Sequence, residues 1–124
     1  MLLIDSHTHL YLENFNDDID DVIQKAVDAS VKYMLFPAID RSTFSEMRKL
    51  SDRFPNNCFP MIGLHPTSVK EDYLDELDLV EKELEKGNYC GIGEIGIDLY
   101  WDKTFAKQQQ QAFRHQLKLA KNYD

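Results

Sequence analysis

Two histidines separated by one residue, His7 and His9, follow the apolar run at residues 2–4 and the acid Asp5. In an extended segment, residues i and i+2 point to the same side, so both imidazoles would face one cavity. Imidazole combined with carboxylate is a ligand set typical of divalent metals such as Zn²⁺. The pattern predicts a metal site at the end of a first strand, and a pair of surface histidines in a loop is the alternative.

The acid Glu94 lies within "GIGEIGID", an otherwise apolar and glycine-rich stretch. A carboxylate in such a segment is costly to bury unless it is paired or bound to a metal. Gly91, Gly93 and Gly96 leave room for a backbone or a ligand to approach closely. We therefore predict Glu94 to be a metal ligand, with a salt-bridged structural acid as the alternative.

Two further polar residues end apolar segments, and both are candidate catalytic residues. His65 lies in "GLHP", where the following proline stiffens the loop, and we expect it to contact substrate or a bound phosphate rather than a metal. Asp98 ends the segment that holds Glu94 and is expected either to orient a ligand or to cap the next turn. For the neighbouring Tyr100 and Trp101, core packing is favoured over a place in the wall of the site.

Apolar runs alternate with helical stripes along the whole chain. Strands are predicted at 2–6, 32–39, 58–66 and 89–98. Helices are predicted at 17–30, from Thr43 with Glu46 completing a capping box, after Ser68 with Glu71 in the same role, and from Thr104 to the end. The inward face of the last helix is expected to carry Phe105, Ala112, Phe113, Leu117 and Ala120.

This order, strand then helix four times over, predicts a single α/β domain with a parallel sheet covered by helices. Ligands and catalytic residues of such folds gather at the carboxyl ends of the strands. His7, His9, His65, Glu94 and Asp98 all follow or end predicted strands. They are therefore expected to share one edge of the sheet.

The charge balance of 14 basic and 22 acidic residues, −8 in total, does not attract nucleic acid at long range. An anionic substrate would need a local positive centre, and a metal ion could be that centre. The two cysteines, Cys58 and Cys90, form no disulfide framework and indicate reduced thiols in the cytoplasm. We expect no signal peptide, because "MLLID" reaches an acid at the fifth residue without a basic flank. We expect no membrane partner, because no apolar run is long enough for a membrane helix.

The segments "IDSHTHL", "MIGLHP", "GEIGIDLYW" and "QQQAFRHQLKLAKNYD", in this order and spacing, resemble the TatD family of metal-dependent hydrolases. The resemblance covers essentially the whole chain. It implies a TIM barrel of the amidohydrolase type and deoxyribonuclease activity on DNA, including 3′-end exonucleolysis, with one or two divalent ions (Zn, Mg or Mn). It makes His7 and His9 ligands of the first metal, Glu94 a ligand that can bridge two, and His65 a residue near substrate. Tyr11 stands where "HxHLD" members have an acid.

A complete TIM barrel has about 250 residues, whereas this chain has four βα units. The resemblance therefore implies that residues 1–124 are the N-terminal half of a (β/α)8 barrel, either a fragment of a longer enzyme or a truncated gene product. The further metal ligands would follow strands five, six and eight, so little DNase activity is expected from these residues alone. Open strand edges would favour self-association.

Other function classes remain open. An amidohydrolase acting on C–N bonds, or a phosphoesterase, would also begin with HxH on its first strand. The acid in "GEIGID" favours the nuclease, because many amidohydrolases are expected to carry a bridging lysine there. A non-enzymatic alternative is an inactive half-barrel that serves as an assembly module.

Overall fold

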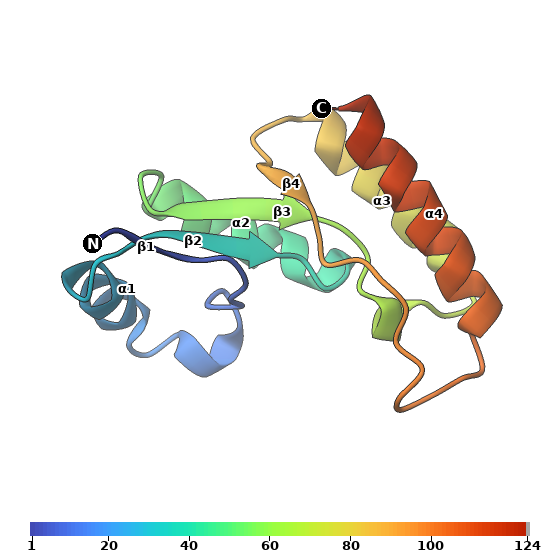
Figure 1. Cartoon of the computed structure of the whole chain (residues 1–124), viewed down its shortest axis with the longest axis horizontal. Coiled ribbons are helices and arrows are strands. Elements are labelled where there is room, and N and C mark those ends of the chain that lie inside the picture. The colour runs from blue at the N-terminus through green and yellow to red at the C-terminus, as the bar shows by residue number, and fades with distance from the viewer. Residues whose placement is uncertain (124) are drawn as a thin grey trace.

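The computed structural model describes residues 1–123, which form a four-stranded parallel sheet with strand order β1-β2-β3-β4. A helix follows each strand, as predicted (Figure 1). The strands are β1 (Leu3–Asp5), β2 (Val31–Pro37), β3 (Cys58–Ile62) and β4 (Gly91–Ile92). The helices are α1 (Ile19–Asp28), α2 (Arg41–Arg53), α3 (Tyr73–Glu85) and α4 (Ala106–Asn122), with short 3₁₀ turns at Glu13–Phe15 and Pro66–Ser68. Residue 124, the end of the last predicted helix, lies outside the described residues.

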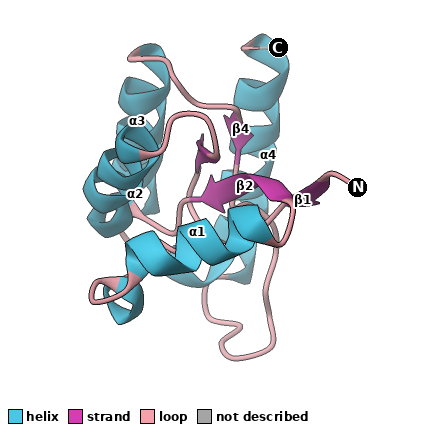
Figure 2. Cartoon of the chain, turned by 90° about the vertical axis from the view of Figure 1, so that its left-hand side faces the viewer, coloured by secondary structure: helices cyan, strands magenta, loops and turns pink. Residues whose placement is uncertain are grey.

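Burial alternates along the central strands. Met34 and Phe36 of β2 and Ile62 of β3 are buried in one core with side chains from α1, α2 and α3, whereas Leu35 and Phe59 are only half-buried. Alternate residues of a strand point to opposite faces, so one face of the sheet packs on helices and the other is less covered. Helices α3 and α4 contact each other and run side by side in Figure 1, and α4 lies next to β4 in Figures 1 and 2.

The second helix begins earlier than predicted. Asp40, not Thr43, is its N-cap, and the Asp40 carboxylate accepts a hydrogen bond from the Ser42 amide at 3.0 Å. The Thr43 hydroxyl reaches back to the Asp40 amide, so Thr43 occupies the third helical position of the capping box. Glu46, predicted to complete that box, instead pairs with Lys49. The predicted N-cap, Thr43, therefore lies three residues after the actual one, Asp40.

The third helix begins later than predicted. Ser68 ends a 3₁₀ turn and its hydroxyl donates to Asp40 at 3.0 Å, whereas the N-cap residue of α3 is Asp72. Helix α3 starts at Tyr73, where Arg41 at the start of α2 pairs with Asp72 and with the buried carboxylate of Glu76. Contacts between two helix N-termini, which sequence periodicity cannot show, set this boundary.

Strand β4 is much shorter than the predicted 89–98. Backbone hydrogen bonds join Cys90 and Gly93 to β3, but the amide of Glu94 donates to Ala38, just beyond β2. The chain thus leaves β3 after two paired residues and crosses to the next strand. The prediction missed this because alternation and apolar runs do not report a change of hydrogen-bonding partner.

The inward face of α4 differs from the prediction. Ala112 is buried as predicted, but Leu117 is 48% exposed and Ala120 is exposed, and the buried face instead includes Gln109, Gln116 and Leu119. The Gln116 amide group is buried because it hydrogen-bonds both the amide and the carbonyl of Leu64. Tyr100 and Trp101 are also not core residues, because each is 81% exposed in the loop before α4.

No helix within residues 1–123 combines the length and apolar character needed to cross a bilayer.

A polar cluster joins α2, α3 and the start of the last βα unit. Glu83 on α3 accepts hydrogen bonds from Arg48 at 3.1 Å and from Tyr89 at 3.0 Å, and it also pairs with Lys86. Burial by itself would raise the pKa of Glu83, but the hydrogen bonds from these three groups outweigh it and hold that pKa below the ordinary 4.5. Burial also raises the pKa of Tyr89 to about 12. The charged carboxylate is therefore the form that stabilises the fold.

We predict that Glu83→Gln lowers the free energy of unfolding at neutral pH and that the difference from wild type narrows below pH 4.5. The sign follows because a depressed carboxyl pKa adds stability above the unfolded-state value and loses it as pH falls through the folded-state value. Urea unfolding at neutral pH and again below pH 4.5 measures the two differences in free energy of unfolding. The exposed Glu85 on the same helix provides the control Glu85→Gln, and equal losses in the two variants would contradict the prediction.

Candidate metal centre

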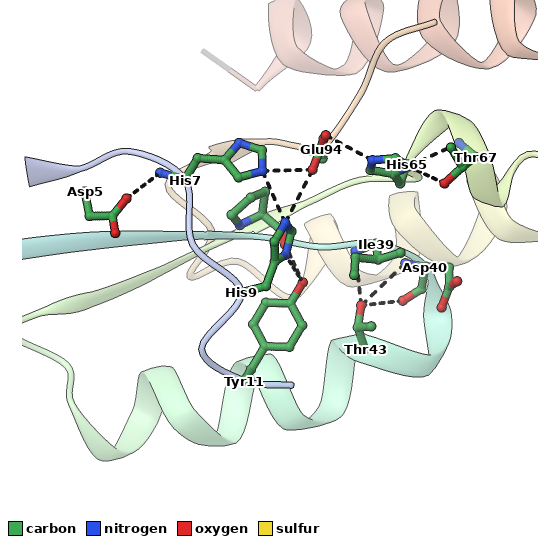
Figure 3. A network of polar contacts seen from close by, with 11 residues as sticks. Asp5, His7, His9, Tyr11, Ile39, Asp40, Thr43, His65, Thr67 and Glu94 are labelled. Carbon is green, nitrogen blue, oxygen red and sulfur yellow. Dashed lines mark hydrogen bonds and ion pairs between the residues drawn. The ribbon is translucent and has the colours of Figure 1, made fainter. Parts of the chain in front are cut away.

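Side-chain atoms of His7, His9 and Glu94, which follow the two outer strands of the sheet, converge on one point (Figure 3). The Nε2 atoms of His7 and His9 are 3.2 Å apart, and Glu94 Oε2 lies 2.9 Å from the first and 3.5 Å from the second. The histidines follow β1 and the glutamate follows β4. The structure therefore brings together the three residues that the sequence predicts as metal ligands.

This donor set fits a divalent ion. Ligand atoms about 2.0–2.2 Å from an ion, at tetrahedral or octahedral angles, are separated from one another by roughly 2.8–3.6 Å, and the three distances lie within that range. Burial, together with the neighbouring His7, lowers the pKa of His9 from its ordinary 6.5. A lowered pKa favours the neutral imidazole, the form that donates a lone pair to a metal.

The backbone around Ala38 fixes the position of Glu94. The Ala38 amide donates to the Gly93 carbonyl at 2.9 Å, and its carbonyl accepts from the Glu94 amide at 3.0 Å. The Gly93 amide donates in turn to Ile62 of β3 at 2.9 Å. The histidine loop is tied to the same sheet, because the Thr8 amide donates to Leu35 at 3.1 Å. Backbone hydrogen bonds to β2, β3 and Ala38 therefore fix both the histidine loop and the Glu94 segment.

A glycine that the sequence analysis did not single out makes this close approach sterically feasible. A Cβ atom at Gly63 would lie 2.8 Å from the carbonyl carbon of Gly93, which is too close for any side chain. Its signal in the sequence is its place in "MIGLHP", two residues before His65. Of the three glycines predicted to give room, Gly91 and Gly93 both face the flexible end of the Met61 side chain, which a Cβ atom would meet at 3.3 Å and 2.8 Å.

His65 approaches Glu94 from the other side. Its Nε2 lies 3.0 Å from Glu94 Oε1, the oxygen that faces away from the closest histidine contact. Its Nδ1 accepts a hydrogen bond from the Thr67 amide at 3.1 Å, and its own amide donates to Ile39 at 2.7 Å. The ring is thus held rigidly beside the cluster.

Asp98 lies with His65 on a neighbouring cavity of about 430 Å³. Its carboxylate accepts a hydrogen bond from the Tyr100 amide at 2.9 Å, which is the turn-capping alternative of the two predicted for it. The buried Gln109 side chain hydrogen-bonds both the amide and the carbonyl of Asp98. Lys70, Trp101 and Phe105 complete the principal walls of this cavity.

The sequence model of one protein family, described as TatD related DNase, matches residues 4–124. The chain belongs to this family. Among curated relatives, the Escherichia coli uncharacterized metal-dependent hydrolase YjjV is 31% identical over 98% of this chain and 47% of its own length. YabD of Bacillus subtilis, with the same description, is 28% identical over 97% of this chain and 47% of its own. A human relative named Deoxyribonuclease TATDN3 is 32% identical over 96% of this chain and 48% of its own.

Solved structures of TatD proteins have the same fold. The crystal structure of Escherichia coli YjjV, a TatD homolog, superposes with a TM-score of 0.88 at 31% identity, covering 98% of this chain and 48% of that one. A TatD family hydrolase from Entamoeba histolytica gives a TM-score of 0.75 at 26% identity, covering 99% and 47%. The chain spans about half the length of the relatives it matches. The fold is therefore the half-barrel of a TatD-type TIM barrel, as predicted.

We predict that Gly63→Ala lowers the free energy of unfolding by about 1–3 kcal/mol, the usual cost of forcing extra atoms into a packed site. The added methyl group must push the Gly93 backbone, and Glu94 with it, away from β3. Urea unfolding measures the loss. Gly91→Ala is the matched control, because its methyl group would meet only the mobile end of the Met61 side chain at 3.3 Å. A loss no greater than in this control would refute the steric argument.

Proposed function

We propose that residues 1–124 form the N-terminal half of a metal-dependent deoxyribonuclease and supply its first metal site. The observation that carries this proposal is the convergence of two imidazole nitrogens and one carboxylate oxygen within 4.8 Å, at the carboxyl edge of a parallel sheet. His7, His9 and Glu94 would hold a divalent ion, Zn, Mn or Mg. The family membership supports hydrolysis as the reaction, and the name of the human relative supports DNA as the substrate.

The surrounding residues would complement a bound ion. A divalent ion in this site would supply the positive charge that attracts a phosphodiester and stabilises charge developing on its oxygens. Such a local charge is needed because the chain carries a net charge of −8. His65, held by Thr67 beside Glu94, would donate its Nε2 proton to that carboxylate and keep it oriented toward the ion, at the side where substrate would approach.

The cavity next to His65 would receive the terminal nucleoside of a DNA strand. Trp101, which is 81% exposed, and Phe105 offer aromatic surface on which a base can stack. Lys70 adds a positive charge to the same wall. A pocket of about 430 Å³ beside the candidate metal site has room for the end of one strand, and we therefore propose exonucleolytic attack, at the 3′ end, rather than attack within a duplex.

We also propose that a chain of this length self-associates. Within residues 1–123, β1 pairs only with β2 and β4 only with β3, so both outer strands present unpaired backbone groups. Leu3 and Ile4 of β1 are 40% and 56% exposed. Open edges with apolar neighbours favour pairing with another chain, here a two-fold dimer that joins β4 to β1.

A reducing compartment suits the two cysteines, and we propose the cytoplasm. Cys58 is buried and Cys90 exposed, and both are free thiols. Burial raises the pKa of the Cys58 thiol to about 12, which keeps it protonated and unreactive.

We predict that His7→Ala and Glu94→Ala each remove most of the bound metal, because each deletes one of three converging donors. Elemental analysis of the purified chain after loading with Zn²⁺ or Mn²⁺ measures the content. The control is His115→Ala, which removes a histidine that is hydrogen-bonded to Glu81 on α3. Metal content equal in all four proteins would disprove the site.

We predict that a single-stranded oligonucleotide quenches the fluorescence of Trp101, the only tryptophan in the chain, when a divalent ion is present. Adding a chelator should reverse the quenching, since the ion supplies the attracting charge. Blocking the 3′ end with a phosphate should weaken binding, whereas blocking the 5′ end should not. We expect little hydrolysis of a labelled strand by these residues alone, and robust chelator-sensitive cleavage would contradict that expectation.

We predict that light scattering on a size-exclusion column gives a mass near twice the 14.5 kDa of one chain. Replacing the exposed β1 residue Ile4 by lysine should shift the species toward the monomer, because a charged edge opposes strand pairing. The control is Leu74→Lys, at an exposed position on α3. A wild-type monomer would exclude the proposed dimer.

A further inference from the structure

The ring nitrogen of His9 that faces away from the cluster is hydrogen-bonded to a buried tyrosine. His9 Nδ1 lies 2.8 Å from the hydroxyl oxygen of Tyr11, and that hydroxyl lies 2.5 Å from the carbonyl oxygen of Pro37 (Figure 3). Tyr11 is 5% exposed, so its hydroxyl can bond only to protein groups around it. The three groups form a line that ends on the last residue of β2.

The direction of each hydrogen bond in this line follows from the groups themselves. The Pro37 carbonyl can only accept, so the single proton of the Tyr11 hydroxyl is committed to it. The hydroxyl oxygen is then left as an acceptor toward His9. For the 2.8 Å contact to be a hydrogen bond, His9 Nδ1 must carry a proton and donate it. The lone pair of the neutral ring is then on Nε2.

We infer that Tyr11 is a positioning residue that fixes His9 in its Nδ1-protonated form, so that the Nε2 lone pair points at the metal site. This inference deepens the proposed function and rests on it. In metal sites, a partner for the outer ring nitrogen fixes both the tautomer and the orientation of the ligating histidine. Here a neutral hydroxyl, which itself donates to the carbonyl of Pro37 in β2, does this.

His65 is held in the opposite form by an analogous contact. The Thr67 backbone amide can only donate, so His65 Nδ1, at 3.1 Å, must accept. The proton of the neutral ring is then on Nε2, which faces Glu94 Oε1 at 3.0 Å. The two rings around one carboxylate therefore differ in character: His9 offers a lone pair and His65 offers a proton. His65 can therefore serve as the reference for His9 in the same spectrum.

Long-range ¹H–¹⁵N NMR spectra of the metal-free chain at mildly alkaline pH distinguish the two neutral forms of each histidine. We expect His9 to be protonated on Nδ1 and His65 on Nε2, with His9→Ala and His65→Ala assigning the signals. This measurement needs neither activity nor a bound ion. A wild-type spectrum in which His9 carries its proton on Nε2 would overturn the inference, whatever the variants show.

Tyr11→Phe removes the hydroxyl and keeps the ring, and it should mix the two forms of His9 while leaving His65 unchanged. Zn²⁺ affinity, measured by competition with a chromogenic chelator, should fall about 10- to 100-fold, the usual effect of losing a partner of a metal ligand. Tyr33→Phe is the matched control, because this β2 tyrosine packs its ring on Phe59, away from His9.

The outcomes separate this inference from the proposed function. An unchanged His9 signal and unchanged affinity in Tyr11→Phe would overturn the role of Tyr11 while leaving the metal site intact. A wild-type chain that has the expected His9 form but binds no Zn²⁺ would instead reject the metal site. A Tyr11→Phe chain that fails to fold would leave the wild-type spectrum to decide.

Discussion

The hydrogen bonds of one buried residue, Ala38, hold the candidate site together. Its amide and carbonyl engage Gly93 and Glu94, so the chain that has just paired with β3 is drawn across to the end of β2. A carboxylate placed this way can meet histidines that follow β1, although β1 and β4 are the two outer strands of the sheet. The curvature of the sheet thus brings the donor atoms of His7, His9 and Glu94 together. The absence of a side chain at Gly63 makes that curvature possible.

The order of elements was predictable from sequence because each element has its own hydrophobic period. Four apolar runs and four helical stripes suffice for a parallel sheet with helices, and the structure has that order. Element boundaries were less predictable because contacts from elsewhere determine them. Arg41 binds the start of α3, and the Glu94 amide changes partners from one strand to another. Neither event leaves a mark in local periodicity.

The site itself was largely predictable from residue type and place. A polar residue that ends an apolar strand is unusual enough to mark the carboxyl edge, and His7, His9 and Glu94 all meet there. The supporting residues were not predictable in this way. Gln109 and Gln116 look like solvent-facing helix residues, yet their amide groups satisfy loop backbone at Asp98 and Leu64. The contact between Tyr11 and His9 could not be predicted from the sequence, because it depends on the Pro37 carbonyl in a distant strand.

The short first strand has a consequence for local stability. β1 has three paired residues, all exposed, and a single neighbour, so opening it disturbs little of the core. Segments of this kind exchange their amide hydrogens through local fluctuations rather than through global unfolding. An ion shared by His7, His9 and Glu94 would link the segment after this strand to Glu94, which lies 85 positions beyond His9 in the chain. A bound ion would then stabilise β1 against local opening, and release of the ion would coincide with fraying of the N-terminus.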